Sequence, residues 1–349
     1  MANQIKIDEI DAKILRTLIL ESRTSFTDIA KECHITVTAV RMRYKRLWRE
    51  GVINGEKMLV NPHCLGYRHI VDLGIISAPE DESKVAKFLE KKPYISQVVS
   101  PRDQYCFFGK TALKDLNELH SIIEDLESNH DIKHVDALIW AEAANIEYPE
   151  NLVIKPLKFE GKNNKTMNRT SGYSEQTLVK IDEIDRKIAE TLADNARTPF
   201  KKIAADLGIS SKTVIQRYKK LRENLLTLST ITVDLNKLGY TALANIYIKL
   251  SNRSRMLEVN NQLLQIPNMI VIIRLIGAYD VYCAVALENF NTLFETEKKI
   301  KSVSGFENRS ISITPMPSAW PLHLFPSLLK GESVQPKYWP PAPEPIAKK

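Results

Sequence analysis

The sequence predicts an α+β protein in which a unit of three short helices and a following βαββαβ module each occur twice. The pentapeptide Ile-Asp-Glu-Ile-Asp at residues 7–11 returns at residues 181–185, and many identities follow at the same offset. After each pentapeptide the apolar residues have helical spacing. After each Leu-Gly-Tyr, at residues 65–67 and 238–240, they have strand spacing. The chain is therefore predicted to use one architecture twice.

Composition sets outer bounds on the kind of protein. The 349 residues include 49 Lys and Arg against 42 Asp and Glu, a net charge of +7, which weakly favours an anionic partner. The apolar fraction of 44% is enough for several cores. The sequence has no apolar run of membrane-spanning length and no secretion signal, so we expect a cytoplasmic protein without a membrane partner. Four scattered cysteines predict reduced thiols, with neither a disulfide framework nor a zinc site.

The first helical unit begins with a helix for which Asp8 is the expected N-cap. A second helix is predicted over residues 26–31, followed by a short turn in which His34 takes a positive φ at some cost. Thr36 is the expected cap of a third helix. The buried stripe of that helix has i, i+4, i+7 spacing and consists of Val40, Tyr44 and Leu47.

The second helical unit repeats this order. Gly208 makes the turn, because glycine adopts positive φ without strain. Ser210 is the expected cap of the third helix. The corresponding buried stripe is Val214, Tyr218 and Leu221.

The two third helices are strongly basic, and this feature carries the functional prediction. Two short helices joined by a tight turn, the second of them basic, are typical of a helix-turn-helix. Its recognition helix offers side chains to base edges while Lys and Arg neutralise phosphates. A solvated basic face is the alternative, but its recurrence in both copies favours double-stranded DNA as the partner. The predicted DNA-binding residues are Thr36, Thr38, Arg41, Arg43, Lys45, Arg46, Ser210, Ser211, Lys212, Thr213, Gln216, Arg217, Lys219 and Lys220.

A wing is predicted directly after the first unit. Asn54-Gly55 lies between apolar runs, which is the strongest short hairpin signal. The second copy has no glycine at residues 225–231, so its wing is expected to be shorter or packed against something.

Each Leu-Gly-Tyr is followed by the strand and helix order of a ferredoxin-like module, which is one antiparallel sheet with two helices on one face. The open face of each sheet must be covered, and the simplest solution is that the two modules pack on one another. In the first copy the strands are predicted at 69–76, 95–100, 105–112 and 132–140, and the helices at 82–90 and 115–127. In the second copy the strands are predicted at 242–250, 269–276, 279–287 and 306–313, and the helices at 255–264 and 293–303.

These features together resemble the Lrp/AsnC family, the leucine-responsive feast/famine regulators of bacteria and archaea. The matching residues are Ile181-Asp182-x-x-Asp185, Leu207-Gly208-Ile209-Ser210, Arg217, Leu221, Leu238-Gly239-Tyr240 and Gly277-Ala278-Tyr279-Asp280. The resemblance implies a DNA-binding regulator similar to a family dimer built into one polypeptide, with room for further homo-oligomers. It also implies an amino-acid effector contacting Gly277, Tyr279 and Asp280. The first copy has Ser100-Pro101-Arg102-Asp103 at that turn, so a pocket there is doubtful.

Six segments follow from these features. A Lys-, Asn- and Ser-rich stretch predicts a flexible linker, and the Pro-rich end predicts an extended tail, parts of which pack through aromatic residues. The segments are the first winged helix-turn-helix (1–60), the first ferredoxin-like module (61–150), the linker (151–178), the second winged helix-turn-helix (179–234), the second module (235–316) and the tail (317–349).

Catalysis finds little support in the sequence. Phosphate-binding, dinucleotide-binding, serine-hydrolase and zinc-protease motifs are missing, and the seven histidines are dispersed. We therefore expect no enzyme, no cofactor and no metal site. Two alternatives stay open. Siroheme decarboxylases resemble two Lrp-type subunits side by side, and a ligand-sensing scaffold that does not bind DNA would also fit the architecture. Both basic helices are kept in this chain, which favours the sequence-specific regulator.

Overall fold

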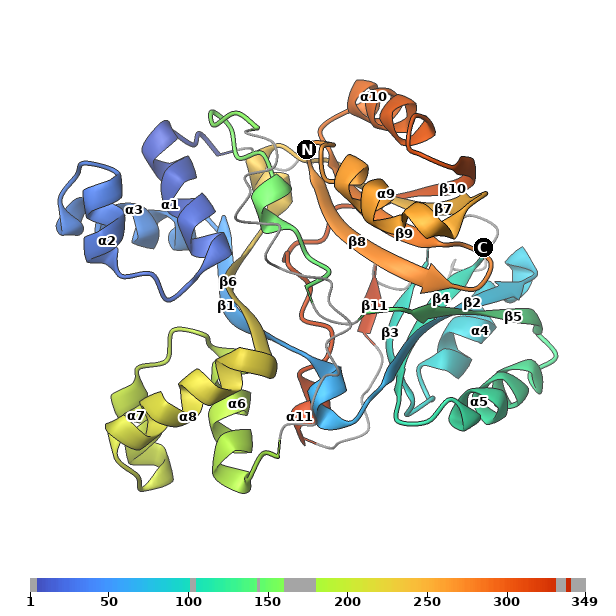
Figure 1. Cartoon of the computed structure of the whole chain (residues 1–349), viewed down its shortest axis with the longest axis horizontal. Coiled ribbons are helices and arrows are strands. Elements are labelled where there is room, and N and C mark those ends of the chain that lie inside the picture. The colour runs from blue at the N-terminus through green and yellow to red at the C-terminus, as the bar shows by residue number, and fades with distance from the viewer. Residues whose placement is uncertain (1–4, 101–104, 143–144, 160–179, 331–336, 340–349) are drawn as a thin grey trace, which may run out of the picture.

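The structure is a computed structural model that describes residues 5–100, 105–142, 145–159, 180–330 and 337–339 (Figure 1). Two helical units lie on one side of the molecule, and a large curved sheet with its covering helices lies on the other. Within these ranges no helix is both long and apolar enough to cross a membrane.

The helices of both units form where the apolar spacing predicts them. The first unit contains α1 (Glu9–Leu20), α2 (Phe26–Glu32) and α3 (Val37–Arg49), and the second contains α6 (Glu183–Asp194), α7 (Phe200–Leu207) and α8 (Ser211–Asn224). Asp8, Thr36 and Ser210 cap their helices as expected, each accepting a backbone N–H three residues on. His34 (φ 54°) and Gly208 (φ 65°) both adopt the expected left-handed conformation in the turn.

The predicted Asn54-Gly55 wing hairpin is wrong. Residues Ile53–Val60 form one continuous strand, β1, which pairs antiparallel with β6 (Leu226–Val233) of the second unit. Gly55 lies in extended backbone and pairs with Thr232 of β6. A Cβ added at Gly55 would collide with the Thr232 hydroxyl, so the absence of a side chain leaves room for that residue. A hairpin would turn the chain away from this partner strand.

The paired strands are exchanged between the two helical cores. Helix α1 packs on Ile231 and Val233 of β6, so the second half of the chain completes the core of the first unit. In the other core, Met58 and Val60 of β1 pack among the buried residues of α6 and α8. Neither helical core is complete without a strand from the other half of the chain.

Beyond these strands, the chain has the βαββαβ order at both predicted places. The first stretch contains β2 (His69–Ser77), α4 (Glu82–Leu89), β3 (Ile95–Val99), β4 (Phe107–Leu113), α5 (Asn117–Glu127) and β5 (Ile132–Trp140). The second contains β7 (Ala242–Leu250), α9 (Met256–Leu263), β8 (Met269–Ile276), β9 (Val281–Leu287), α10 (Phe290–Lys301) and β10 (Phe306–Pro315). Short 3-10 helices join the elements at Pro62–Leu65, Pro79–Asp81, Pro149–Asn151, Leu235–Leu238 and Arg253–Arg255.

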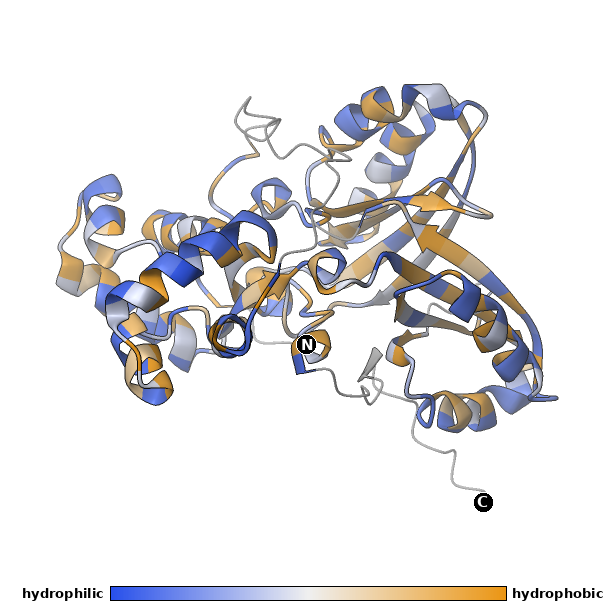
Figure 2. Cartoon of the chain, turned by 60° about the horizontal axis from the view of Figure 1, so that its bottom comes forward, coloured by the Kyte–Doolittle hydropathy of each residue, from blue (hydrophilic) through white to orange (hydrophobic). Residues whose placement is uncertain are grey.

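The two stretches join edge to edge into one sheet with the order β10-β7-β9-β8-β5-β2-β4-β3-β11. Their junction is narrow, because β5 and β8 pair at two positions, Ile139 with Ile276 and Trp140 with Leu275. The sheet curves at this seam, with α4 and α5 outside one half and α9 and α10 outside the other (Figure 1). Its strands are predominantly hydrophobic (Figure 2). The inner faces meet, as expected, and Phe108 stacks on Tyr247 with ring centroids 5.1 Å apart.

The predicted linker and tail are partly packed. Leu152 and Ile154, at the start of the predicted linker, are buried against the first helical core, and residues 160–178 lie outside the described part of the chain. In the tail, Trp320 and Phe325 are buried, which agrees with the expectation that its aromatic residues pack. The tail also forms α11 (Ser327–Lys330) and β11 (Lys337–Trp339), which pairs parallel with β3.

Candidate nucleic-acid interface

The outward face of α3 combines basic, polar and apolar side chains. Thr38, Arg41 and Lys45 are exposed at positions that share one helix face. Met42 lies among them with 68% of its surface exposed, and the sequence analysis did not single it out. Thr36 closes the amino end of the helix by accepting the N–H of Ala39 at 3.1 Å.

The outward face of α8 is different in sequence but similar in kind. Lys212, Gln216 and Lys219 are exposed, and Ile215 is an exposed apolar residue beside them. Ser210 accepts the N–H of Thr213 at 3.1 Å, and the hydroxyl oxygens of Ser210 and Thr213 lie 2.8 Å apart. Ser211 and Thr213 are half-buried, so the exposed predicted contacts on this helix are Lys212, Gln216, Lys219 and Lys220. Of these, Lys220 lies 4.0 Å from the Asp185 carboxylate.

Three of the predicted DNA-binding arginines are already engaged within the protein. Arg43 donates to the carboxylates of Asp8 and Asp11, at 2.6 and 2.8 Å, and Arg46 also donates to Asp11. The Asp11 side chain is fully buried, and a buried carboxylate is stable where positive partners surround it. These ion pairs therefore hold α3 against the amino end of α1.

Arg217 makes the same contacts in the second unit. It donates to Asp182 at 2.6 Å and to Asp185 at 2.8 Å. The backbone N–H of Asp185 and the Arg217 guanidinium together hold the pKa of the Asp182 carboxyl below its usual value. Arg43, Arg46 and Arg217 therefore each have a structural role, and their predicted contact with DNA stays a prediction.

The two helical units are also fastened to each other by a reciprocal pair of arginines. The guanidinium of Arg23 lies over the ring of Phe200, 4.1 Å from the centroid, and donates to the Thr198 carbonyl at 3.1 Å. Arg197 lies over the ring of Phe26 at 4.6 Å and donates to the carbonyls of Ser22 and Thr24. This contact joins the helical unit that contains α3 to the one that contains α8.

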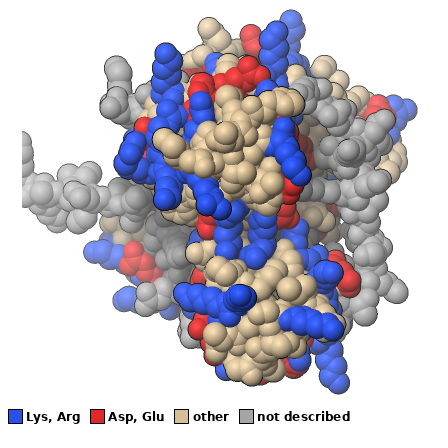
Figure 3. Space-filling model, turned by 90° about the vertical axis from the view of Figure 1, so that its left-hand side faces the viewer, with Lys and Arg blue, Asp and Glu red and all other residues tan. Residues whose placement is uncertain are grey.

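Positive charge is prominent on the side of the molecule formed by the two helical units. Figure 3 faces this side and shows Lys and Arg side chains around both helical lobes and between them. Arg41, Lys45, Lys212 and Lys219 have no ion-pair partner among the residues that the structure describes, so their charges are available to an external anion.

The turn expected to hold an effector serves the contact between the two sheet halves. A Cβ at Gly277 would lie 2.7 Å from the Ala137 carbonyl of β5, so the turn packs closely on the other module. Asp280 is fully buried, accepts the N–H of Leu250 at 2.8 Å and pairs with Arg253 at 2.5 Å. Tyr279 packs on Tyr247. None of these three residues lines the cavity described next, and their effector role stays a prediction.

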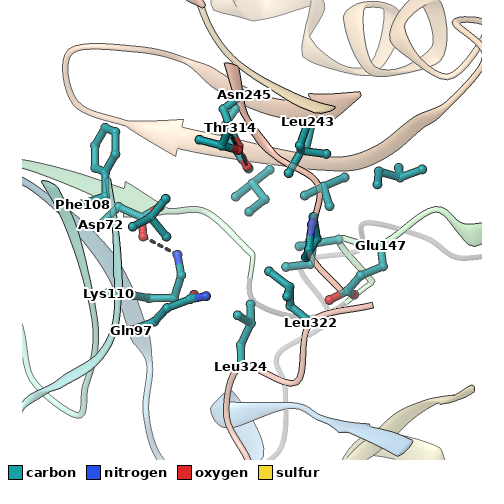
Figure 4. A pocket seen from close by; sticks show the side chains of 18 of the residues that line it. Asp72, Gln97, Phe108, Lys110, Glu147, Leu243, Asn245, Thr314, Leu322 and Leu324 are labelled. Carbon is teal, nitrogen blue, oxygen red and sulfur yellow. Dashed lines mark hydrogen bonds and ion pairs between the residues drawn. The ribbon is translucent and has the colours of Figure 1, made fainter. Parts of the chain in front are cut away.

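A chamber lies between the inner faces of the two sheet halves, and the tail closes its third side (Figure 4). Its cavity volume is about 100 Å³ when the space open to solvent is left out. The first module contributes Asp72, Gln97, Val99, Phe108, Lys110 and Trp140. The second contributes Leu243, Asn245, Tyr247, Ile270, Val271, Ile273, Tyr282, Ala284 and Thr314, and the tail contributes Pro317, Trp320, Leu322 and Leu324. Ile146 and Glu147 complete the lining.

Two polar groups interrupt this mainly apolar wall. The Lys110 ammonium pairs with Asp72, whose other oxygen accepts the indole N–H of Trp140 at 2.7 Å. Burial lowers the pKa of Lys110. On the opposite wall, Asn245 accepts the Tyr282 hydroxyl at 2.8 Å and donates to Thr314 at 3.1 Å. The sequence led to no prediction of this chamber, although a lysine between Phe108 and Ala112 on an inward strand face was a usable signal.

Comparisons with known proteins agree with the helical geometry. Residues 181–222 match the AsnC-type helix-turn-helix domain, and residues 7–54 match a winged helix-turn-helix DNA-binding domain. The chain is 34% identical over 119 residues to the HTH-type transcriptional regulator LrpA of Pyrococcus horikoshii, covering 34% of this chain and 84% of that protein. It is 30% identical over 118 residues to the regulatory protein AsnC of Haemophilus influenzae, covering 34% of this chain and 79% of that protein.

Two solved structures of one protein match nearly the whole chain. The siroheme decarboxylase NirDL, in complex with an iron-uroporphyrin III analogue, aligns over 93% of this chain and 97% of that chain. The TM-score is 0.60 and the sequence identity is 12%, so the likeness is one of fold alone.

Proposed function

The chain belongs to the Lrp/AsnC family of helix-turn-helix regulators, and we propose that it reads two half-sites of one DNA duplex as a pseudo-dimer within a single polypeptide. The observation that carries this proposal is the pair of outward faces on α3 and α8. Each presents exposed lysine or arginine that has no ion-pair partner in the described part of the protein. Such side chains release counterions from DNA when they reach its phosphates.

Features repeated in the two halves of the chain support a pseudo-dimer that arose by tandem duplication. Both halves keep the same capping aspartates, the same arginine that binds them, and the same element order. In a dimer, an interface between two chains would hold the two units together. Here the β1–β6 pairing and the contacts of Arg23 and Arg197 do so within one chain. Half-sites held in this way lie about 34–36 Å apart per helical turn of DNA between them.

The two recognition helices differ on the surfaces that face outward, so the operator should be an imperfect palindrome. Helix α8 offers Gln216, whose amide can bond an adenine edge at two points, where α3 offers the apolar Met42. Ile215 is an exposed apolar neighbour suited to a thymine methyl group. Replacing Gln216 with Ala should relax the preference for one base at one half-site by about 1–3 kcal/mol of discrimination.

The experiment is a fluorescence-anisotropy titration of the full chain against sites selected from a random DNA library, at two salt concentrations. Tight binding that falls steeply with salt supports the regulator. The Lys219→Ala variant should weaken binding to all sequences, and the exposed Lys298→Ala on α10 is the matched control. Perfectly symmetric selected half-sites would contradict the asymmetry, and equal binding of unrelated sequences would contradict specific recognition.

A second candidate is an enzyme on the same architecture, favoured by the whole-chain likeness to the siroheme decarboxylase. The chemistry of the chamber argues against it. Uroporphyrins carry many carboxylates, whereas among the described residues of the lining Lys110 is the one cationic side chain, and it is already paired with Asp72. The described part of the lining also contains no histidine. An absorbance titration with iron-uroporphyrin tests this candidate. A saturable shift of the Soret band would support tetrapyrrole binding as the function in place of DNA binding.

A further inference from the structure

The chamber between the two sheet halves lies beside the short pairing of β5 with β8. Because β5 and β8 pair at only two positions, the two halves diverge away from the seam, and beside the Phe108–Tyr247 contact their inner faces leave a space between them. Leu243, Val271 and Ile273 line one wall, and Phe108 and Trp140 line the other. Sites that hold small molecules are concave, mainly apolar, and carry a few placed polar groups. This chamber has that composition.

Two of the three charged groups that line the described chamber, Asp72 and Lys110, neutralise each other, and Glu147 adds a further carboxylate. The Asp72 carboxylate receives the Lys110 ammonium on one oxygen and the Trp140 indole N–H on the other. Figure 4 shows Asp72 and Lys110 side by side on the wall, with Glu147 across the chamber. An entering anion would therefore meet one cation that is already paired and two carboxylates. Burial of an unpaired charge in such a place is strongly unfavourable.

Neutral hydrogen-bonding capacity remains. An ammonium has three donors, and that of Lys110 bonds to Asp72 and lies 4.0 Å from the centroid of the Trp140 ring. The opposite wall offers the Asn245 amide and the Thr314 hydroxyl, both of which line the chamber. Amide and hydroxyl groups of this kind favour an uncharged partner that can accept or donate one bond.

We propose that the chamber is a binding site for a neutral, predominantly apolar small molecule with one or two hydrogen-bonding groups. The tail supplies the closing wall through Leu322 and Leu324. Trp320 also lines the chamber and exchanges two backbone hydrogen bonds with Val233 of β6, at 2.8 and 3.0 Å. The site therefore contacts the strand on which the helical units are mounted. This inference stands independently of DNA binding.

The test uses two dyes that share one scaffold. N-phenyl-1-naphthylamine is neutral, and 1-anilinonaphthalene-8-sulfonate is the same ring system with a sulfonate. Both increase in fluorescence in apolar surroundings. We expect saturable binding of one neutral dye per chain, with energy transfer from Trp140 and Trp320, and at least tenfold weaker binding of the sulfonate. Absence of saturable binding of the neutral dye, or equal affinity for both dyes, overturns the proposal.

Variants locate the site and test its charge. Val271→Trp places an indole at a half-buried position in the lining and should weaken binding of the neutral dye at least tenfold. Ile313→Trp adds the same indole at an exposed position on β10 and should leave dye binding unchanged. Ala284→Leu is the second filling variant if circular dichroism shows that Val271→Trp does not fold. Unchanged dye binding in a folded filling variant places the dye elsewhere and refutes the site.

Asp72→Asn separates charge from shape. It leaves the Lys110 ammonium without its carboxylate while keeping the size of the side chain, so the preference for the neutral dye over the sulfonate should shrink or reverse. A preference that does not change in this variant would show that the Asp72–Lys110 pair does not set the charge selectivity, and the neutral-ligand assignment would fall.

Discussion

The reciprocal arginines predict how strongly the two helical units depend on each other. In Arg23→Ala, the second unit loses a guanidinium that lies 4.1 Å from the Phe200 ring centroid and donates to the carbonyls of Ala196 and Thr198. A cation–π contact of this kind contributes about 0.5–2 kcal/mol. Hydrogen bonds from a charged donor contribute about 1.5–3 kcal/mol each when desolvated. Because Arg23 is half-buried, we expect a loss of about 2–4 kcal/mol in the free energy of unfolding.

Arg197→Ala should produce a loss of similar size, because its contacts with Phe26, Ser22 and Thr24 mirror those of Arg23. The double variant should lose less than the sum of the two single variants, since both act on one interface. Urea unfolding followed by circular dichroism measures all three, with the exposed Arg68→Ala as the control.

The same variants should change DNA recognition in a specific way. Without this contact, the distance between α3 and α8 should vary more. The protein should then bind half-sites over a wider range of spacings, while its affinity for a single half-site stays the same. Single-variant losses within about 0.5 kcal/mol of wild type would refute the interpretation of this contact as a clamp, because that is the range of ordinary surface substitutions. An unchanged spacing preference would refute its role in positioning the recognition helices.

Three further predictions rest on single contacts. Lys45→Ala should reduce the slope of log affinity against log salt by about one, as for the loss of one phosphate contact, measured by anisotropy over a salt series. Stability should fall with acid as Asp182 is protonated, because the pKa of Asp182 in the folded protein lies below its unfolded value of about 3.9. The contribution of Asp182 to the free energy of unfolding is complete above that pH. It is lost as the pH falls through the folded-state pKa. Arg217→Ala should lower stability at neutral pH and flatten this acid dependence in urea titrations, and an undiminished acid dependence would count against the ion pair. Gly55→Ala should destabilise the β1–β6 pair by about 1–3 kcal/mol through contact with the Thr232 hydroxyl, and adding Thr232→Ala should restore most of the loss, as judged by thermal unfolding.

The sequence predicted the local elements well because their signals are local. Asp8 and Ser210 cap the helices they were expected to cap, since a short polar side chain before an apolar period satisfies the first N–H groups wherever the helix lies. The strand ranges after each Leu-Gly-Tyr agree with the structure to within a few residues for the same reason. The turn at His34 also formed as expected, because positive φ there depends on the neighbouring helix ends.

Several features that depend on residues far apart in the chain were predicted wrongly or not at all. Asn54-Gly55 has the local chemistry of a hairpin, but pairing with β6 and burial of Met58 in the other helical core override it. Arg43 and Arg217 look like DNA contacts in the sequence because charge alone does not reveal an acidic partner more than thirty residues away. The chamber has no local signal beyond Lys110, since its walls come from strands of both halves and from the tail.

The sequence by itself therefore determined the element order, the caps and the basic character of both recognition helices. These properties follow from the periodicity and chemistry of neighbouring residues. Tertiary structure alone decided which arginines pair with carboxylates within the protein, which strands complete which core, and where a cavity stays open. Each of those outcomes depends on contacts between residues far apart in the chain, such as Arg23 with Phe200 and Asp72 with Lys110.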